Sequence, residues 1–170
     1  MDNGLVRVRF KLDSSDWHGH ASENIWAEPV QGSDSSDIYR LKNSPFFTRG
    51  VSLMDLIRAV PSKDSGGALE AVSIVEQSGH SNYMLVRKGD QKKFNEYWER
   101  LEKLGCSYES GTINLGNRDE LLYAVDVPPS SDIFKVYDVL SNGAAKGVWV
   151  FQEGAVGHDV KTGRSKPVSQ

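Results

Sequence analysis

The sequence has a single cysteine and no long apolar run, and both shortages limit what the chain can be. Cys106 cannot form an internal disulfide, nor can it alone build a cysteine-based structural zinc site. No stretch approaches the ~20 apolar residues that a membrane-spanning helix needs. Residues 1–4 lead straight into an alternating segment, without the apolar core of a signal peptide. We therefore expect a cytoplasmic protein that does not enter membranes.

An excess of positive charge is also missing. The 170 residues include 20 Lys and Arg against 23 Asp and Glu, which gives a net charge of −3. Because nucleic-acid binding depends on summed positive charge, this balance argues against a nucleic-acid partner. The sequence also lacks a nucleophile elbow, a phosphate-binding glycine loop and a dinucleotide-binding fingerprint. We therefore expect no cofactor, and these absences favour a protein that is not an enzyme.

Residues 1–80 consist of short alternating segments between polar loops. Residues 5–12 alternate apolar and basic side chains, as a half-buried strand does. Further strands are expected over 25–30, 38–42, the second part of 51–60, and 69–75, with proline- and glycine-containing loops between them. About five short strands joined in this way are typical of a small barrel or curled sheet. This half is therefore predicted to be a β-rich subdomain.

Residues 81–160 follow the order β-α-β-β-α-β, which is typical of a ferredoxin-like α+β sandwich. The first helix is expected to begin at the N-cap Asp90 and to end at Gly105. Its apolar residues recur at the spacing of one buried face. The second helix is expected to be capped by Ser130 or Ser131 and to end at Asn142-Gly143.

Three shorter segments complete the prediction for the second half. Residues 116–119 are expected to form a turn between two strands. Residues 148–151 are nearly all apolar, which predicts a central strand covered on both faces. Residues 161–170 are polar and basic and are expected to form a flexible tail. The predicted fold class is thus α+β, with a barrel-like first half followed by the sandwich.

Four histidines are the natural candidates for chemistry. His80 and His158 each follow a glycine beyond a predicted strand, so the backbone could turn there and present both imidazoles at one edge. Converging imidazoles could form an acid–base or metal pair, whereas the alternative is that each ring bonds a backbone carbonyl in a turn. His18 and His20 could chelate a metal only with a third ligand. We therefore assign no catalytic residue and no metal site, and keep these histidines as candidates.

Aromatic and acidic loop residues are the candidates for binding. Two adjacent phenylalanines follow a proline, and they could either cap the barrel core or form the apolar anchor of a binding surface. The polar loops 13–22 and 31–37 could dock a basic partner. The candidate binding residues are Trp17, Asp34, Asp37, Phe46, Phe47 and Arg49.

Several short strings occur along the chain in a specific order. They are Val6-Arg7-Val8-Arg9-Phe10, Glu23-Asn24-Ile25-Trp26-Ala27, Tyr39-Arg40-Leu41-Lys42-Asn43-Ser44-Pro45-Phe46-Phe47, Gly50-Val51-Ser52-Leu53-Met54-Asp55, Ser78-Gly79-His80-Ser81, Gly147-Val148-Trp149, Glu153-Gly154 and Gly157-His158. Together they resemble the bacterial family named domain of unknown function 4265, over roughly residues 6–158. The family name implies no activity and no catalytic residue.

These observations leave three functional hypotheses open. The first is a non-enzymatic protein-binding module. By analogy with other small acidic bacterial proteins, it could be an immunity protein that neutralises a bacterial toxin encoded by a neighbouring gene. The second is a small-ligand-binding protein or enzyme with a cleft between the two halves, lined by His80 and His158. The third, which rests on fold analogy, is a regulator that contacts RNA or an RNA-processing enzyme.

Overall fold

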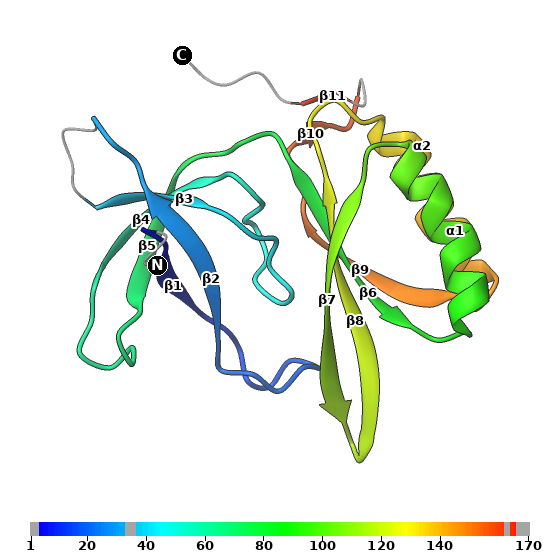
Figure 1. Cartoon of the computed structure of the whole chain (residues 1–170), viewed down its shortest axis with the longest axis horizontal. Coiled ribbons are helices and arrows are strands. Elements are labelled where there is room, and N and C mark those ends of the chain that lie inside the picture. The colour runs from blue at the N-terminus through cyan, green and yellow to red at the C-terminus, as the bar shows by residue number, and fades with distance from the viewer. Residues whose placement is uncertain (1–3, 33–36, 162–163, 166–170) are drawn as a thin grey trace.

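The computed structural model describes residues 4–32, 37–161 and 164–165, and it consists of a barrel beside a helix-covered sheet (Figure 1). The barrel is built from the first half of the sequence. The sheet stands next to it, and both helices cover the face that points away from the barrel. The predicted α+β class and the small N-terminal barrel are thereby confirmed.

Five strands close the barrel. They are β1 (Val6–Lys11), β2 (Ser22–Pro29), β3 (Ile38–Leu41), β4 (Leu56–Pro61) and β5 (Leu69–Glu76). Consecutive strands pair antiparallel, and β1 closes the sheet by pairing in parallel with β5. The alternation in β1 sends Val8 into the barrel core and leaves Arg7 exposed.

The second half forms a four-stranded antiparallel sheet with the strand order β7-β8-β6-β9. Its elements in chain order are β6 (Ser81–Arg87), α1 (Gln91–Lys103), β7 (Ser107–Leu115), β8 (Arg118–Val127), α2 (Ile133–Ala145) and β9 (Trp149–Ala155). Two short strands follow, β10 (His158–Asp159) and β11 (Arg164–Ser165), and they pair with each other. Neither described helix is long and apolar enough to cross a membrane.

The first helix begins where its sequence predicts, but the second does not. The Asp90 carboxylate accepts a hydrogen bond from the backbone nitrogen of Lys93 at 2.8 Å, as an N-cap does. In α2 the N-cap is Asp132, so the prediction of Ser130 or Ser131 is wrong. The Ser131 hydroxyl instead donates to the carbonyl of Leu104 at 2.6 Å and so ties α2 to the end of α1.

The second helix also continues past Gly143 instead of ending there. Gly143 faces the indole of Trp149, and a Cβ at this position would lie 2.5 Å from the ring. The indole nitrogen donates to the carbonyl of Leu140 at 2.9 Å, which fixes the ring against the helix. The glycine is therefore needed for close packing and not for a helix end.

Two strand predictions also need correction. β9 is an edge strand and not a central one, and Val150 is 52% exposed. The apolar run arises because Trp149 and Phe151 face the helices while Val150 faces the other side. The turn before β8 is the two residues 116–117, both with positive φ, so β8 begins at Arg118 and the predicted turn was too long.

Candidate functional site

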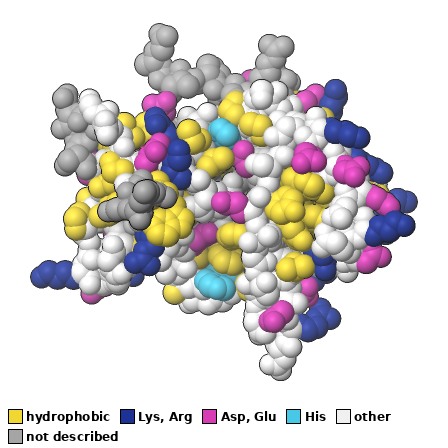
Figure 2. All heavy atoms as spheres, viewed as in Figure 1, with side chains coloured by type: hydrophobic (Ala, Val, Ile, Leu, Met, Phe, Trp, Pro, Cys, Tyr) yellow, Lys and Arg dark blue, Asp and Glu magenta, His cyan; other side chains and the backbone are white. Residues whose placement is uncertain are grey.

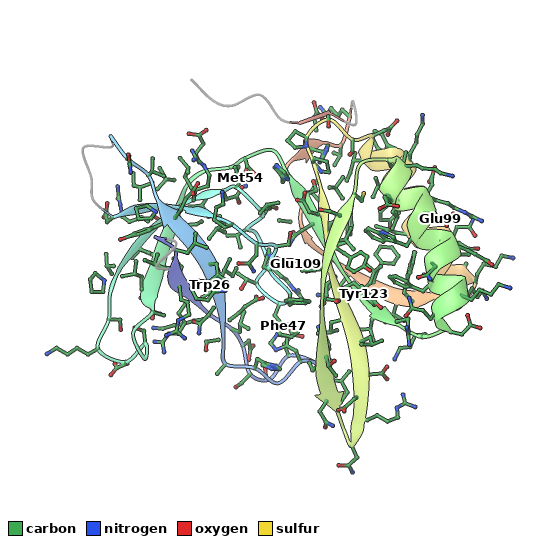
Figure 3. The ribbon with its side chains drawn as sticks, in the orientation of Figure 1. Trp26, Phe47, Met54, Glu99, Glu109 and Tyr123 are labelled. Atoms are coloured by element: carbon green, nitrogen blue, oxygen red, sulfur yellow. The ribbon has the colours of Figure 1, made fainter. Side chains whose placement is uncertain are left out.

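The sheet face that points toward the barrel is packed by a barrel loop, residues 42–55. Phe46 and Phe47 from this loop join an apolar cluster with Met84 of β6 and other side chains of the sheet. The Phe46 ring lies over Gly111 of β7, 3.5 Å from the position that a Cβ would take. Figure 3 shows Phe47 between the barrel and the sheet. The two candidate binding phenylalanines therefore form a wedge that joins the halves of the molecule.

Two carboxylates that the sequence did not mark as functional hold this loop. Glu23 on β2 accepts hydrogen bonds from the backbone nitrogens of Phe46, Phe47 and Thr48 at 2.6, 3.0 and 2.8 Å. Glu109 on β7 accepts one from the backbone nitrogen of Ser44 at 3.0 Å, and burial raises the pKa of Glu109. Little in the sequence indicated this role, because an acidic residue in a strand is common at solvent-facing positions.

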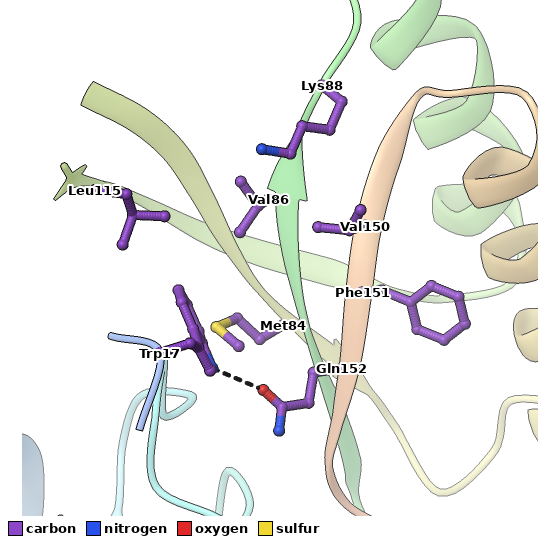
Figure 4. A pocket seen from close by; sticks show the side chains of 8 residues that line it. All are labelled: Trp17, Met84, Val86, Lys88, Leu115, Val150, Phe151 and Gln152. Atoms are coloured by element: carbon purple, nitrogen blue, oxygen red, sulfur yellow. Dashed lines mark hydrogen bonds between the residues drawn. The ribbon is translucent and has the colours of Figure 1, made fainter. Parts of the chain in front are cut away.

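The rest of this sheet face is a groove of about 250 Å³, here called the Trp17 groove (Figure 4). It is lined by Trp17, Met84, Val86, Lys88, Leu115, Val150, Phe151 and Gln152. Trp17, from the loop between β1 and β2, forms one wall, and its indole nitrogen donates to the Gln152 side chain at 3.0 Å. Trp17 is nevertheless 38% exposed. The groove therefore combines a fixed aromatic wall with an apolar floor.

The charges at the two sides of the groove differ. Lys88 lies 3.2 Å and Arg118 lies 3.0 Å from the same oxygen of Glu120, and hydrogen bonds from these cations lower the pKa of Glu120. Because two cations share one carboxylate, this end carries an excess positive charge. Near Trp17, the candidate residue Arg49 is paired with Asp16 at 3.3 Å.

Over the face drawn in Figure 2, acidic and basic side chains are interspersed. No broad patch of a single sign is visible on that face among the residues described. Electrostatic attraction to a polyanion depends on such a patch. The positive charge beside the Trp17 groove is therefore a local feature that can orient one group of a ligand.

His18 and His20 pack around the ring of Phe47. Their ring centroids lie 4.7 and 4.8 Å from that of Phe47, and 5.8 Å from each other. The Nδ1 atom of His18 accepts a hydrogen bond from the backbone nitrogen of His20 at 2.9 Å. Within the described ranges no three histidine, cysteine or acidic side chains are arranged to hold a metal ion. The contacts that the structure gives these two rings therefore support the phenylalanine wedge.

His80 and His158 lie in one corner of the molecule. His80 Nδ1 is 2.8 Å from an oxygen of Asp126, and the His80 side chain is 16% exposed. His158 is completely buried, and its burial lowers its pKa, with the neighbouring His80 adding to this effect. The two histidines therefore come together, but only His80 reaches the surface.

Both ring nitrogens of His158 are used inside the fold. Nδ1 lies 2.6 Å from the Ser81 hydroxyl, and Nε2 lies 3.0 Å from the carbonyl of Pro128. The Pro128 carbonyl can only accept, so Nε2 carries the proton, and Nδ1 of the neutral ring accepts from the Ser81 hydroxyl, which itself accepts from the backbone nitrogen of Gly157. This network attaches the segment after β9 to the start of β6.

The remaining candidates are Asp34 and Asp37. The Asp37 carboxylate is 3.2 Å from the Arg58 guanidinium of β4, and its backbone carbonyl accepts from Ala59 at 2.9 Å. Asp34 lies outside the described residues. Asp37 is thus bound to the barrel itself, on a different part of the molecule from the Trp17 groove.

The architecture defines an α+β protein in which a closed five-stranded barrel packs against an antiparallel sheet covered by two helices. The chain belongs to the family "Domain of unknown function (DUF4265)", whose model matches residues 23–151, and the predicted family resemblance is confirmed. No curated protein matches the sequence.

A solved structure shows the same fold. It is described as a novel crystal structure of a hypothetical protein from Neisseria gonorrhoeae. The two chains are 12% identical and superpose with a TM-score of 0.66, over 92% of this chain and 96% of that one. At this identity the likeness supports the joint arrangement of barrel and sheet and carries no information about activity.

Proposed function

We propose that this protein is a non-enzymatic protein-binding module of the bacterial cytoplasm, and that it acts as an immunity protein which neutralises a toxin. The Trp17 groove is the observation that carries the proposal. Trp17 and Val150 are large apolar residues that are 38% and 52% exposed beside an apolar floor. Exposed apolar surface with a polar rim marks interaction sites, and tryptophan is enriched among the residues that dominate binding energy.

The size of the groove supports a protein partner over a cofactor. Sites for small molecules usually enclose about 300–1,000 Å³, whereas the Trp17 groove has about 250 Å³. This volume lies just below that range and suits one or two apolar side chains of a partner. The partner's side chains would enter the groove while its backbone stayed outside.

We also propose that the second half of the chain is a ferredoxin-like sandwich. The order β6-α1-β7-β8-α2-β9 and the strand order β7-β8-β6-β9 support the interpretation of the second half as a ferredoxin-like sandwich. That fold serves binding proteins and enzymes alike, so the functional argument depends on the groove and not on the fold.

The pair formed by His80 and Asp126 supports a second candidate, a ligand-binding or enzymatic site. A carboxylate that orients an imidazole is the arrangement of many general bases, and the distance of 2.8 Å fits. His158 does not complete this site, because it is fully buried with both nitrogens engaged. The experiment that tests the first function therefore includes a His80 variant.

The test is co-purification of the tagged protein with the product of the neighbouring gene. We expect the wild type to retain the partner in stoichiometric amount and Trp17→Ala to lose it. Trp26→Ala is the matched control, because Trp26 is 50% exposed on the barrel and lies outside the groove. Thermal unfolding of each variant checks that the fold is intact.

The outcomes separate the two candidate functions. Loss of the partner in Trp17→Ala alone supports the binding module, and protection of cells from the co-expressed partner supports the immunity role. If the Trp17 and Trp26 variants retained the partner equally, the Trp17 groove would not be the binding site. Loss of binding or activity in His80→Ala, with Trp17→Ala unaffected, would favour the second candidate.

A further inference from the structure

The strand β9 presents a free edge beside the Trp17 groove. It is outermost in the sheet, and among the described residues its only strand partner is β6. An edge strand offers backbone N–H and C=O groups to another chain, and proteins usually protect such edges with lysine, proline or inward charges. The sequence of β9, WVFQEGA, contains only one charged residue, Glu153. The edge is therefore weakly protected against pairing.

Apolar surface flanks this edge on both faces of the sheet. On the barrel side lies the Trp17 groove, with Val150 52% exposed. On the helix side, Phe134 and Tyr137 of α2 are each 48% exposed, and the Tyr137 ring centroid is 5.8 Å from that of Phe151. Side chains of a strand alternate between the two faces. A strand added to β9 would thus place successive side chains on these two apolar surfaces.

The far end of the edge is already occupied. The carbonyl of Gly154 accepts a hydrogen bond from the backbone nitrogen of Gly50 at 2.9 Å, so the free part is Trp149–Glu153. In an antiparallel pair of two copies, the Gly50 loop of each copy would stand beside the start of the other β9. This obstruction favours a short extended segment of another protein over a second copy of this chain.

The near end of the edge adds a charge preference. The backbone nitrogen of Lys88 donates to the carbonyl of Val148, directly before β9, at 2.9 Å. The Lys88 side chain lines the Trp17 groove beside Val150, and its only ion pair among the described residues is with Glu120, a carboxylate of β8 that Arg118 also contacts. An acidic residue of an added segment would be attracted there.

We propose that β9 binds its partner by strand addition. An extended segment pairs with Trp149–Glu153, places large apolar side chains in the Trp17 groove and against Tyr137, and carries an acidic residue at the Lys88 end. Main-chain hydrogen bonds then supply affinity, and the two apolar surfaces supply specificity. This inference rests on the proposed function, because it names how the partner of that same groove is recognised.

The first measurement uses defined peptides with the full chain. The probe has about six residues, the length of a typical strand, with leucine and phenylalanine at successive positions so that each face carries an apolar side chain, and with an aspartate at one end. We expect it to slow hydrogen exchange of the β9 amides. Two further versions carry backbone N-methyl groups at one or the other alternate set of positions. In strand addition only one set faces the edge, so one version loses binding and the other keeps it.

The second measurement uses matched variants of this protein with the probe and with the neighbouring gene product. Val150→Lys places a protecting charge on the β9 edge, and we expect affinity to fall by at least about tenfold. Val72→Lys is the control, because Val72 is 58% exposed on the barrel strand β5. We expect it to bind as the wild type does.

The results distinguish a failure of strand addition from a failure of the proposed function. If no probe binds, if both N-methylated versions bind equally, or if Val150→Lys has no effect, strand addition is overturned. Protein binding still stands in that case when Trp17→Ala loses the neighbouring gene product. If the probe behaves as expected but that product does not co-purify, strand addition is supported and the immunity role fails. If the protein instead formed a dimer through β9, the proposal that a segment of another protein pairs with this strand would be overturned.

Discussion

A single carboxylate oxygen of Glu23 accepts hydrogen bonds from both the backbone nitrogen and the hydroxyl of Thr48, at 2.8 and 2.7 Å. The same carboxylate also binds the backbone nitrogens of the two phenylalanines that precede Thr48. These bonds fix the phenylalanine wedge to β2 of the barrel, because they satisfy consecutive N–H groups of a loop that has no strand partner there. The Glu23 side chain therefore holds the two phenylalanines in the position from which they pack on the sheet.

Replacing Glu23 with glutamine should lower the free energy of unfolding by about 1.5–3 kcal/mol, the range for hydrogen bonds to charged groups. The amide nitrogen cannot accept, so at least one of these bonds is lost. Urea unfolding measures the change. The control is Glu28→Gln, whose exposed pairs with Arg40 and Lys42 contribute below about 1 kcal/mol. Equal effects of the two substitutions would show that Glu23 does not hold the wedge.

Replacing Phe46 with alanine should destabilise the fold by about 2–4 kcal/mol, toward the lower end of the range for core phenylalanines because the ring is only partly buried. Phe134→Ala, at a 48% exposed position, should cost below about 1 kcal/mol. Denaturant unfolding compares the two variants. A stable Phe46→Ala protein that had lost its partner would instead identify this ring as a binding anchor.

Acid should weaken the fold through His158. Burial lowers the pKa of His158 from its usual 6.5, so the unfolded chain binds a proton there more readily than the folded protein does. The stabilising contribution is complete above pH 6.5 and is lost as the pH falls below that value toward the lowered pKa. We expect the difference in unfolding free energy between wild type and His158→Asn to shrink as the pH falls from about 8 to about 5.

Two carboxyl groups change the stability with pH in the opposite direction to His158. The pH dependence is therefore compared between the wild type and the His158→Asn variant. Burial raises the pKa values of Asp55 and Glu109, so their protonation favours the folded state and their contribution falls as the pH rises through the raised values. Both groups are present in the wild type and in His158→Asn, and their effects cancel in the difference. A difference that stays constant with pH would argue against a neutral, buried His158.

Cys106 should be unreactive in the folded protein. Burial raises the pKa of its thiol to about 12, so almost no thiolate is present near neutral pH. We expect alkylation by iodoacetamide to be very slow in buffer and fast after unfolding in urea, with mass spectrometry as the readout. Rapid labelling of the folded chain would mean that the segment between α1 and β7, which carries Cys106, opens frequently.

The helices and most strands could be predicted because their signals are local. Apolar side chains at helical spacing predict α1, and an acidic N-cap marks where it begins at Asp90. Where a local signal served a tertiary contact, the prediction was wrong. Ser131 bonds Leu104 instead of capping a helix, and Gly143 makes room for Trp149 instead of ending one. In both cases the competing partner belonged to another element, the end of α1 for Ser131 and β9 for Gly143.

Local patterns in the chain were enough to predict the order of the barrel strands and of the β-α-β-β-α-β half, the buried stripe of α1 and the family to which the chain belongs, because each depends on residues near one another or on their linear order. Three features became visible only in the folded chain: which strands lie at the edges of the sheet, that His158 is buried, and that Trp17 contacts Gln152 across 135 positions of sequence. These features depend on how the barrel closes through the pairing of β1 with β5, and on how the barrel loops pack on the sheet. Neither leaves a periodic pattern in the chain, because the pairing depends on the summed burial of many residues at once.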